Sequence, residues 1–138
     1  MDEIQSTLAS YGITVDLLCD AAFQCLPTII SAPPDQTLLK KRMNVALMDR
    51  NVSVLIIGAI LLEAKLITQN PTSIYASDPH WLLADEIIGI SIAELIGGPK
   101  AKLVFTHYDQ NKPGILSDLG PFLDDAMAGL IAGCMVSA

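Results

Sequence analysis

Apolar residues recur at helical spacing through the first part of this chain. Residues 2–10 predict a short helix, and Gly12 is placed to end it because glycine readily adopts the left-handed conformation that follows a helix. Thr14 is then a candidate N-cap. The next segment, VDLLCDAAFQCL, carries apolar residues three and four positions apart, which is typical of a second helix.

Prolines and polar residues separate the next elements. The stretch SAPPDQT contains two adjacent prolines and predicts a loop. Asp35 or Thr37 can cap a third helix over TLLKKRMNVALMDR. Its end, Asp49-Arg50-Asn51, forms a polar break before a strongly apolar segment.

That apolar segment is VSVLIIGAILLEAKL, and its residues are apolar on nearly every side. Such a helix is expected to lie at the centre of a fold rather than at its surface. Its β-branched residues would also suit a buried strand. Its length and its ending, LLEAKL, favour a helix, so we predict that it is the central helix.

The second half of the chain contains two further apolar segments. After the loop TQNPTS, residues 81–98 predict a helix that Ser77 or Asp78 caps and that ends at two glycines. KAKLVFTHYDQ is the most strand-like or irregular stretch, and a last helix begins near Pro121. We therefore predict one all-α domain over residues 1–138, a bundle of about six helices around an apolar central one.

The composition supports a single globular domain and argues against nucleic-acid binding. The chain has 138 residues, 51% of them hydrophobic, and a net charge of -7. A nucleic-acid-binding protein usually carries a basic patch, and the few basic residues here form no long run. The apolar excess favours a homo-oligomer.

The cysteines and the N-terminus predict a cytoplasmic protein. Three cysteines without a CxxC motif are typical of free thiols in a reducing compartment, and the acidic start MDEIQS lacks the positive region of a signal peptide. The longest uncharged stretch, residues 51–62, is shorter than the roughly 20 residues that span a bilayer. We expect no membrane span, although peripheral membrane contact stays open.

Two pairs of adjacent acids open apolar helices in the second half, Asp85-Glu86 and Asp124-Asp125. In each helix a glycine lies four residues after an acid, which places both on one face and lets a neighbouring helix approach closely. Acids in a first helical turn also serve as ordinary caps, because the helix dipole favours negative charge there. The repetition of the pattern favours a shared metal site.

Carboxylates without a nearby His/Cys cluster suit Mg²⁺, which prefers oxygen ligands. The stretch HYDQNKPGIL lies between the two acidic pairs. From it, Lys112 is a candidate for binding phosphate oxygens, and Asp109 for orienting that lysine or adding a metal ligand. Arg50 is a second candidate phosphate contact. His107 is either a general acid or a structural residue.

Three motifs, DEIIG, YDQNKPGIL and FLDDAMAGLIAG, together resemble those of the phosphatidylglycerophosphatase A superfamily. The likeness is to its short soluble branch, which includes archaeal α-ribazole-5′-phosphate phosphatases. The resemblance implies an all-helical fold with a central helix, and Mg²⁺-dependent hydrolysis of a phosphomonoester. The superfamily's acidic motif positions and its lysine-proline fall here on Asp85, Glu86, Asp109, Lys112-Pro113, Asp124 and Asp125.

One departure from the superfamily concerns the substrate. Its membrane-bound members carry an arginine-rich stretch after the lysine-proline, whereas KPGILSDLG contains no arginine. We therefore expect α-ribazole-5′-phosphate as the substrate, with phosphatidylglycerophosphate as the alternative. The rival from another class is a non-catalytic helical protein that self-associates.

Overall fold

The computed structural model describes residues 2–77 and 83–137. These residues form eight α-helices, a π-helical turn and a 3-10 helix, and they contain no strand. The all-α prediction is confirmed, with more helices than expected. In chain order the elements are α1 (Glu3–Ser10), α2 (Val15–Gln24), α3 (Gln36–Met48), α4 (Arg50–Leu62), η1 (Glu63–Thr68), α5 (Ile74–Ser77), α6 (Ala84–Gly97), α7 (Ala101–Asn111), η3 (Gly114–Asp118) and α8 (Pro121–Val136).

Local caps begin the first four helices. The side chain of Thr14 accepts the Leu17 N–H, and that of Asp35 accepts the Leu38 N–H, as the sequence predicts. Asp2 and Asp49 start α1 and α4 in the same way. Each cap satisfies a backbone N–H that has no partner within the helix.

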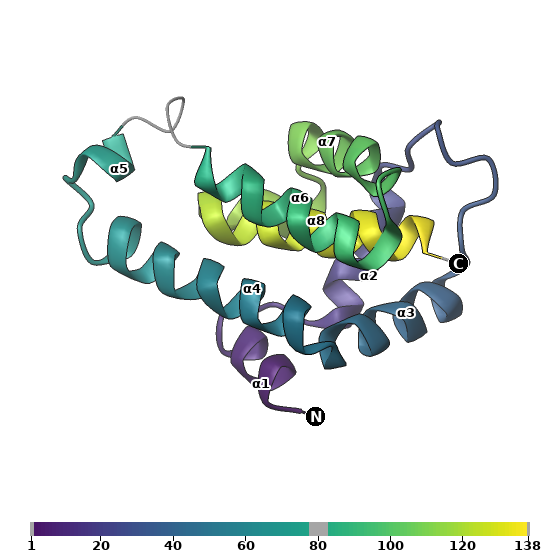
Figure 1. The fold of residues 1–138 in the computed structure, drawn as a ribbon, viewed down its shortest axis with the longest axis horizontal. Coiled ribbons are helices and arrows are strands. Elements are labelled where there is room, and N and C mark those ends of the chain that lie inside the picture. Colours follow the sequence, from purple (N-terminus) through teal and green to yellow (C-terminus); the bar gives the residue numbers. More distant parts are fainter. Residues whose placement is uncertain (1, 78–82, 138) are drawn as a thin grey trace.

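The central helix of the fold is α8 rather than α4. Every residue from Phe122 to Met135 is buried, and α8 contacts α2, α3, α4, α6 and α7 (Figure 1). The prediction that VSVLIIGAILLEAKL is central was wrong, because α4 buries only one side. Val54 and Leu61 on its other side are 65% and 63% exposed. Small residues along α8 allow neighbours to pack on every side, whereas apolar composition does not say which faces are covered.

Glycines bring α6 and α8 into close contact. A methyl group at Gly129 would overlap the backbone of Gly89, and one at Gly89 would overlap the backbone of Asp125. The close approach expected from the spacing of these glycines is therefore present. It places the N-terminal turns of α6 and α8, which carry the two acidic pairs, next to each other.

The expectation of a strand-like or irregular segment at KAKLVFTHYDQ was wrong. The segment is α7, and it buries Ala101, Val104, Phe105 and Tyr108, whose spacing covers one helical face. Strand propensity is a weak local preference, and tertiary packing against α8 outweighs it here. For α6, the expected cap Asp78 lies outside the described residues, as do His80 and Trp81, and Ser77 ends α5.

Within residues 2–77 and 83–137, one helical segment is long and apolar enough to cross a membrane. Because η1 continues α4, helical structure extends from Arg50 to Thr68, over 19 residues with a mean hydropathy of 1.8. The sequence predicts no span here, because the uncharged stretch ends at residue 62. A core helix of a soluble protein meets the same criteria of length and composition, but only 28% of the apolar window is buried here.

Candidate metal centre

Three aspartates from two helices form an acidic cluster. Asp109 of α7, Asp124 and Asp125 of α8 each offer one carboxylate oxygen, and these atoms all lie within 4.8 Å of one another. Asp124 and Asp125 are buried, and Asp109 is partly buried. Like charges this close need a cation, shared protons or both.

The chain direction after α7 brings these side chains together. α7 ends at Lys112, whose left-handed backbone (φ 44°) breaks the helix, and the buried Pro113 follows. The 3-10 helix η3 then leads to Gly120 and to Pro121 at the first position of α8. This short connection places the last turn of α7, with Asp109, against the first turn of α8.

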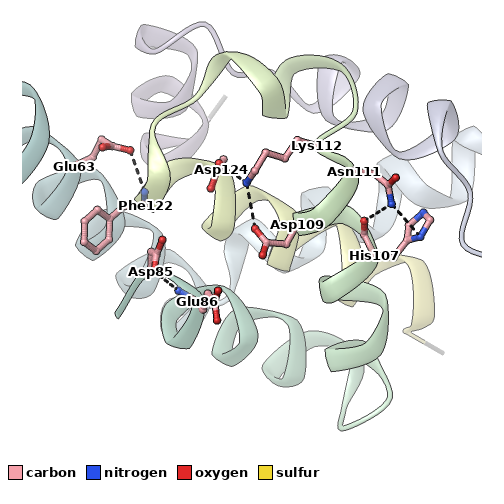
Figure 2. A network of polar contacts seen from close by, with 9 residues as sticks. All are labelled: Glu63, Asp85, Glu86, His107, Asp109, Asn111, Lys112, Phe122 and Asp124. Carbon is pink, nitrogen blue, oxygen red and sulfur yellow. Dashed lines mark hydrogen bonds and ion pairs between the residues drawn. The ribbon is translucent and has the colours of Figure 1, made fainter. Parts of the chain in front are cut away.

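Lys112 joins two members of the acidic cluster. Its Nζ lies 2.7 Å from Oδ2 of Asp124 and 3.3 Å from Oδ1 of Asp109 (Figure 2). Burial lowers the pKa of Lys112, but the hydrogen bond and charge of Asp124, together with those of Asp109, outweigh burial and raise it. The ammonium group is therefore held in its charged form beside the cluster.

One lysine does not neutralise three carboxylates. Burial, followed by the contacts and charges of Asp109 and Asp124, raises the pKa of Asp125 to about 11. Burial also raises the pKa of Asp124, although Asp125 and Lys112 partly offset this. Oδ1 of Asp124 is buried and has no hydrogen-bond partner among the described residues. The cluster is thus short of positive charge and has a free ligand atom, which fits a bound cation.

The acidic cluster opens into a cleft that also contains the other predicted acids. The cleft has a volume of about 490 Å³, and Asp85 and Glu86 of α6 line it together with the cluster. Asp85 Oδ1 accepts the N–H of Glu86 at 2.9 Å, and Glu86 itself is exposed. Both residues therefore face the cleft but lie outside the three-aspartate group. Their role as metal ligands stays a prediction.

Comparison with known proteins identifies the family. The sequence model for phosphatidylglycerophosphatase A matches residues 8–138. This chain belongs to the phosphatidylglycerophosphatase A family. The resemblance drawn from the three sequence motifs is thereby confirmed, and the family is that of a phosphatase.

Two relatives extend this comparison. An uncharacterized protein of Methanocaldococcus jannaschii is 46% identical over 101 residues, which cover 70% of this chain and 80% of that protein. The crystal structure of low temperature requirement C protein from Listeria monocytogenes matches with a TM-score of 0.81. It covers 97% of this chain and 91% of that one, at 22% identity. The second match shows a shared fold alone.

Sequence reasoning missed Glu63 in this member of the phosphatidylglycerophosphatase A family. Glu63 is only 6% exposed, and its Oε1 accepts the backbone N–H of Phe122 (Figure 2). The same oxygen also accepts the backbone N–H of Leu123. Burial raises its pKa most, the two hydrogen bonds lower it, and the charges of Asp124 and Asp85 raise it further. The only sequence signal for Glu63 was its position as a single acid directly after the uncharged stretch of residues 51–62.

Two other candidate residues lie elsewhere. Arg50 is exposed at the start of α4, roughly 20 Å from Glu63 along the helix, and is not among the residues that line the cleft. His107 faces α2, where its Nε2 lies 2.7 Å from the carbonyl oxygen of Cys25, and Asn111 contacts its ring (Figure 2). This packing favours the structural interpretation of His107.

Proposed function

We propose that this protein is a phosphatase that hydrolyses a phosphomonoester and depends on Mg²⁺. One observation carries the proposal: three clustered carboxylates and one lysine share an open cleft, and a buried oxygen of Asp124 has no partner among the described residues. The family supports the reaction class. The charge and chemistry of the cluster support the cation.

The residues present fit Mg²⁺ in both number and chemistry. Asp109, Asp124 and Asp125 would hold the ion, and Asp85 and Glu86 of α6, which line the same cleft, are the further candidate ligands. Carboxylates and water are the ligands that Mg²⁺ prefers. When bound, such an ion stabilises negative charge on a phosphoryl group and makes a bound water more acidic.

Lys112 is the candidate contact for the phosphate group. Among the described residues that line the cleft, it is the only cation. Its partly exposed ammonium group can donate to phosphate oxygens while Asp124 and Asp109 keep it charged and oriented. Positioning and charge neutralisation of this kind account for most of the catalysis in phosphoryl transfer. Arg50 would contact phosphate only if a substrate extended along α4.

The substrate that we favour is α-ribazole-5′-phosphate, acted on in the cytoplasm. The segment after Lys112 and Pro113 is the short 3-10 helix η3, and it contributes no arginine to the cleft. A cleft of about 490 Å³ is of the size that binds small molecules. Both observations suit a soluble ester better than a lipid headgroup.

The alternative substrate, phosphatidylglycerophosphate, has an observation of its own. The segment Arg50–Thr68 presents exposed apolar residues on α4, and Ile67 at its end lines the cleft. A peripheral membrane contact along α4 would bring a lipid phosphate to the acidic cluster. The same apolar surface also supports the homo-oligomer that we expect. It equally suits the rival, a non-catalytic protein that self-associates.

Phosphate release decides between these possibilities. Purified protein with Mg²⁺ is offered α-ribazole-5′-phosphate, phosphatidylglycerophosphate in detergent micelles, and a panel of small phosphomonoesters. We expect release from the first, and release from the lipid alone would select the alternative. Asp124→Asn should abolish release with unchanged helical circular dichroism, whereas Asp20→Asn, an exposed aspartate on α2, should not. No release from any ester and no Mg²⁺ binding by calorimetry would favour the rival.

A further inference from the structure

Glu63 connects the end of α4 to the start of α8 across a long stretch of sequence. It is the first residue of the π-helical turn η1, and its Oε1 lies 3.1 Å from the Phe122 N and 3.2 Å from the Leu123 N. The residues that follow, Asp124 and Asp125, belong to the acidic cluster. π-Helical turns of this kind occur frequently at functional sites.

α8 lacks a cap of its own. Its N-cap residue is Gly120, which has no side chain to accept a hydrogen bond. By contrast, α1 to α4 each begin with a side-chain cap from the preceding residue. The position of the first turn of α8 therefore depends on Glu63, a residue from a different part of the chain.

Capping alone does not account for a buried glutamate at this position. Its second oxygen, Oε2, is buried and has no hydrogen-bond partner among the described residues, which costs free energy. Gly120 has an extended backbone (φ -74°, ψ 173°) that any residue adopts, so a serine or aspartate there could cap α8 locally. A methyl group at Gly120, however, would overlap the Glu63 carboxyl group. Gly120 and Glu63 thus fit each other.

We propose that Glu63 is a positioning residue for the metal centre: by holding the first turn of α8, it keeps Asp124 and Asp125 directed at Asp109. This inference rests on the proposed function, because it assumes that the acidic cluster binds a divalent cation. Removal of a residue that orients metal ligands lowers metal affinity or activity roughly 10- to 100-fold.

The test compares Glu63→Ala and Glu63→Gln by Mg²⁺ calorimetry and by steady-state kinetics. We expect Glu63→Ala to weaken Mg²⁺ binding about 10- to 100-fold and to lower kcat at saturating Mg²⁺, with KM for the ester little changed. Glu63→Gln keeps an oxygen acceptor and should restore most of the affinity. Equal Mg²⁺ binding and kcat in Glu63→Ala and the wild type would overturn the inference.

Asp49→Ala is the matched control. Asp49 also accepts two backbone N–H groups at a helix start, those of Asn51 and Val52, but it lies at the other end of α4 from Glu63. Its removal should lower the melting temperature and leave Mg²⁺ affinity unchanged. A loss of Mg²⁺ affinity in Asp49→Ala equal to that in Glu63→Ala would show a general effect of stability, and the inference would fall.

Gly120→Ala supplies an independent test that does not remove the glutamate. In the wild-type background it should displace Glu63 and weaken Mg²⁺ binding. In the Glu63→Ala background the space is free, so it should cause no further loss. Losses of Mg²⁺ affinity that simply add in the double variant would overturn the inference. If Glu63→Ala fails to fold, the Mg²⁺ affinities of the single variants Gly120→Ala and Glu63→Gln still decide it. If the wild type binds no Mg²⁺, the proposed function fails and this inference fails with it.

Discussion

Lys112 and Asp124 form an ion pair of 2.7 Å at the point where α7 gives way to α8. The pair joins the lysine of HYDQNKPGIL to the first acid of FLDDAMAGLIAG. Because Lys112 also contacts Asp109, it is shared between two carboxylates of the cluster. Its ammonium group therefore lies between a residue of α7 and a residue of α8.

Replacement of Lys112 should lower activity more than stability. Lys112→Ala removes a charged donor from the developing phosphate charge, and we expect kcat/KM to fall roughly 100-fold. Lys102→Ala, an exposed lysine on the same helix, is the control and should retain full activity. Steady-state kinetics at saturating Mg²⁺ measure both. Wild-type kinetics in Lys112→Ala would remove this residue from the site.

Mg²⁺ should stabilise the wild-type protein, and Asp125→Asn should abolish that effect. At a concentration of 100 times its Kd, a ligand that binds only the folded state adds about 2.7 kcal/mol. Without Mg²⁺, Asp125 holds a proton at neutral pH because its pKa is raised to about 11, so asparagine closely mimics it. Thermal unfolding with Mg²⁺ and with chelator tests both expectations. A full Mg²⁺ effect in Asp125→Asn would exclude this residue as a ligand.

The stability of the metal-free protein should fall as the pH rises. The pKa of Asp125 is raised from 3.8 to about 11 in the fold, first by burial and then by its acidic neighbours. A carboxyl group that binds its proton more tightly when folded contributes stability below its unfolded pKa, and this is lost as the pH approaches its folded pKa. Melting temperatures in chelator should therefore decrease from about pH 5 to about pH 9.

Asp125→Asn is the control for that pH series, since it removes the titrating group. The variant should show a shallower decrease than the wild type. Mg²⁺ binding displaces the proton of Asp125. The Mg²⁺ affinity of the wild type should therefore increase as the pH rises from about 5 to about 9. Parallel pH profiles for the two proteins in chelator would assign the dependence to other residues.

The contact between α6 and α8 should not tolerate a side chain. Gly129→Ala places a methyl group against the Gly89 backbone, which cannot move aside as a flexible side chain would. We expect a loss of about 1–3 kcal/mol in the free energy of unfolding, measured with urea.

Gly58→Ala is the opposite case and serves as the control. Gly58 lies inside α4 with open space where its Cβ would be, so alanine should stabilise the protein by about 0.5–1 kcal/mol. If Gly129→Ala were as stable as the wild type, the close approach of α6 and α8 would be wrong.

Short-range features of the fold were readable from the sequence. Thr14 and Asp35 cap helices because a side-chain oxygen accepts an N–H three residues later, and both partners lie within one turn. Helical spacing likewise predicted that glycines on α6 and α8 allow a neighbouring helix to approach closely, and the structure supplied the neighbour. Asp124 and Asp125 were selected by the acidic pair that opens an apolar helix, and Asp109 by its place in HYDQNKPGIL, together with the family resemblance.

Only the tertiary structure decided which helix lies at the centre and which side chains meet. The residues of α4 and α8 are similarly apolar. Only α8 has small residues on enough faces for other helices to pack all around it, so α8 lies at the centre of the fold. The hydrogen bonds from α8 to Glu63 join residues 59 and 60 positions apart, a distance at which no periodic pattern carries information. The sequence determined which carboxylates were available, and packing determined that Asp109, Asp124 and Asp125 meet while Arg50 does not. Local hydrogen bonds depend on neighbours along the chain, whereas a site depends on which helices share a surface.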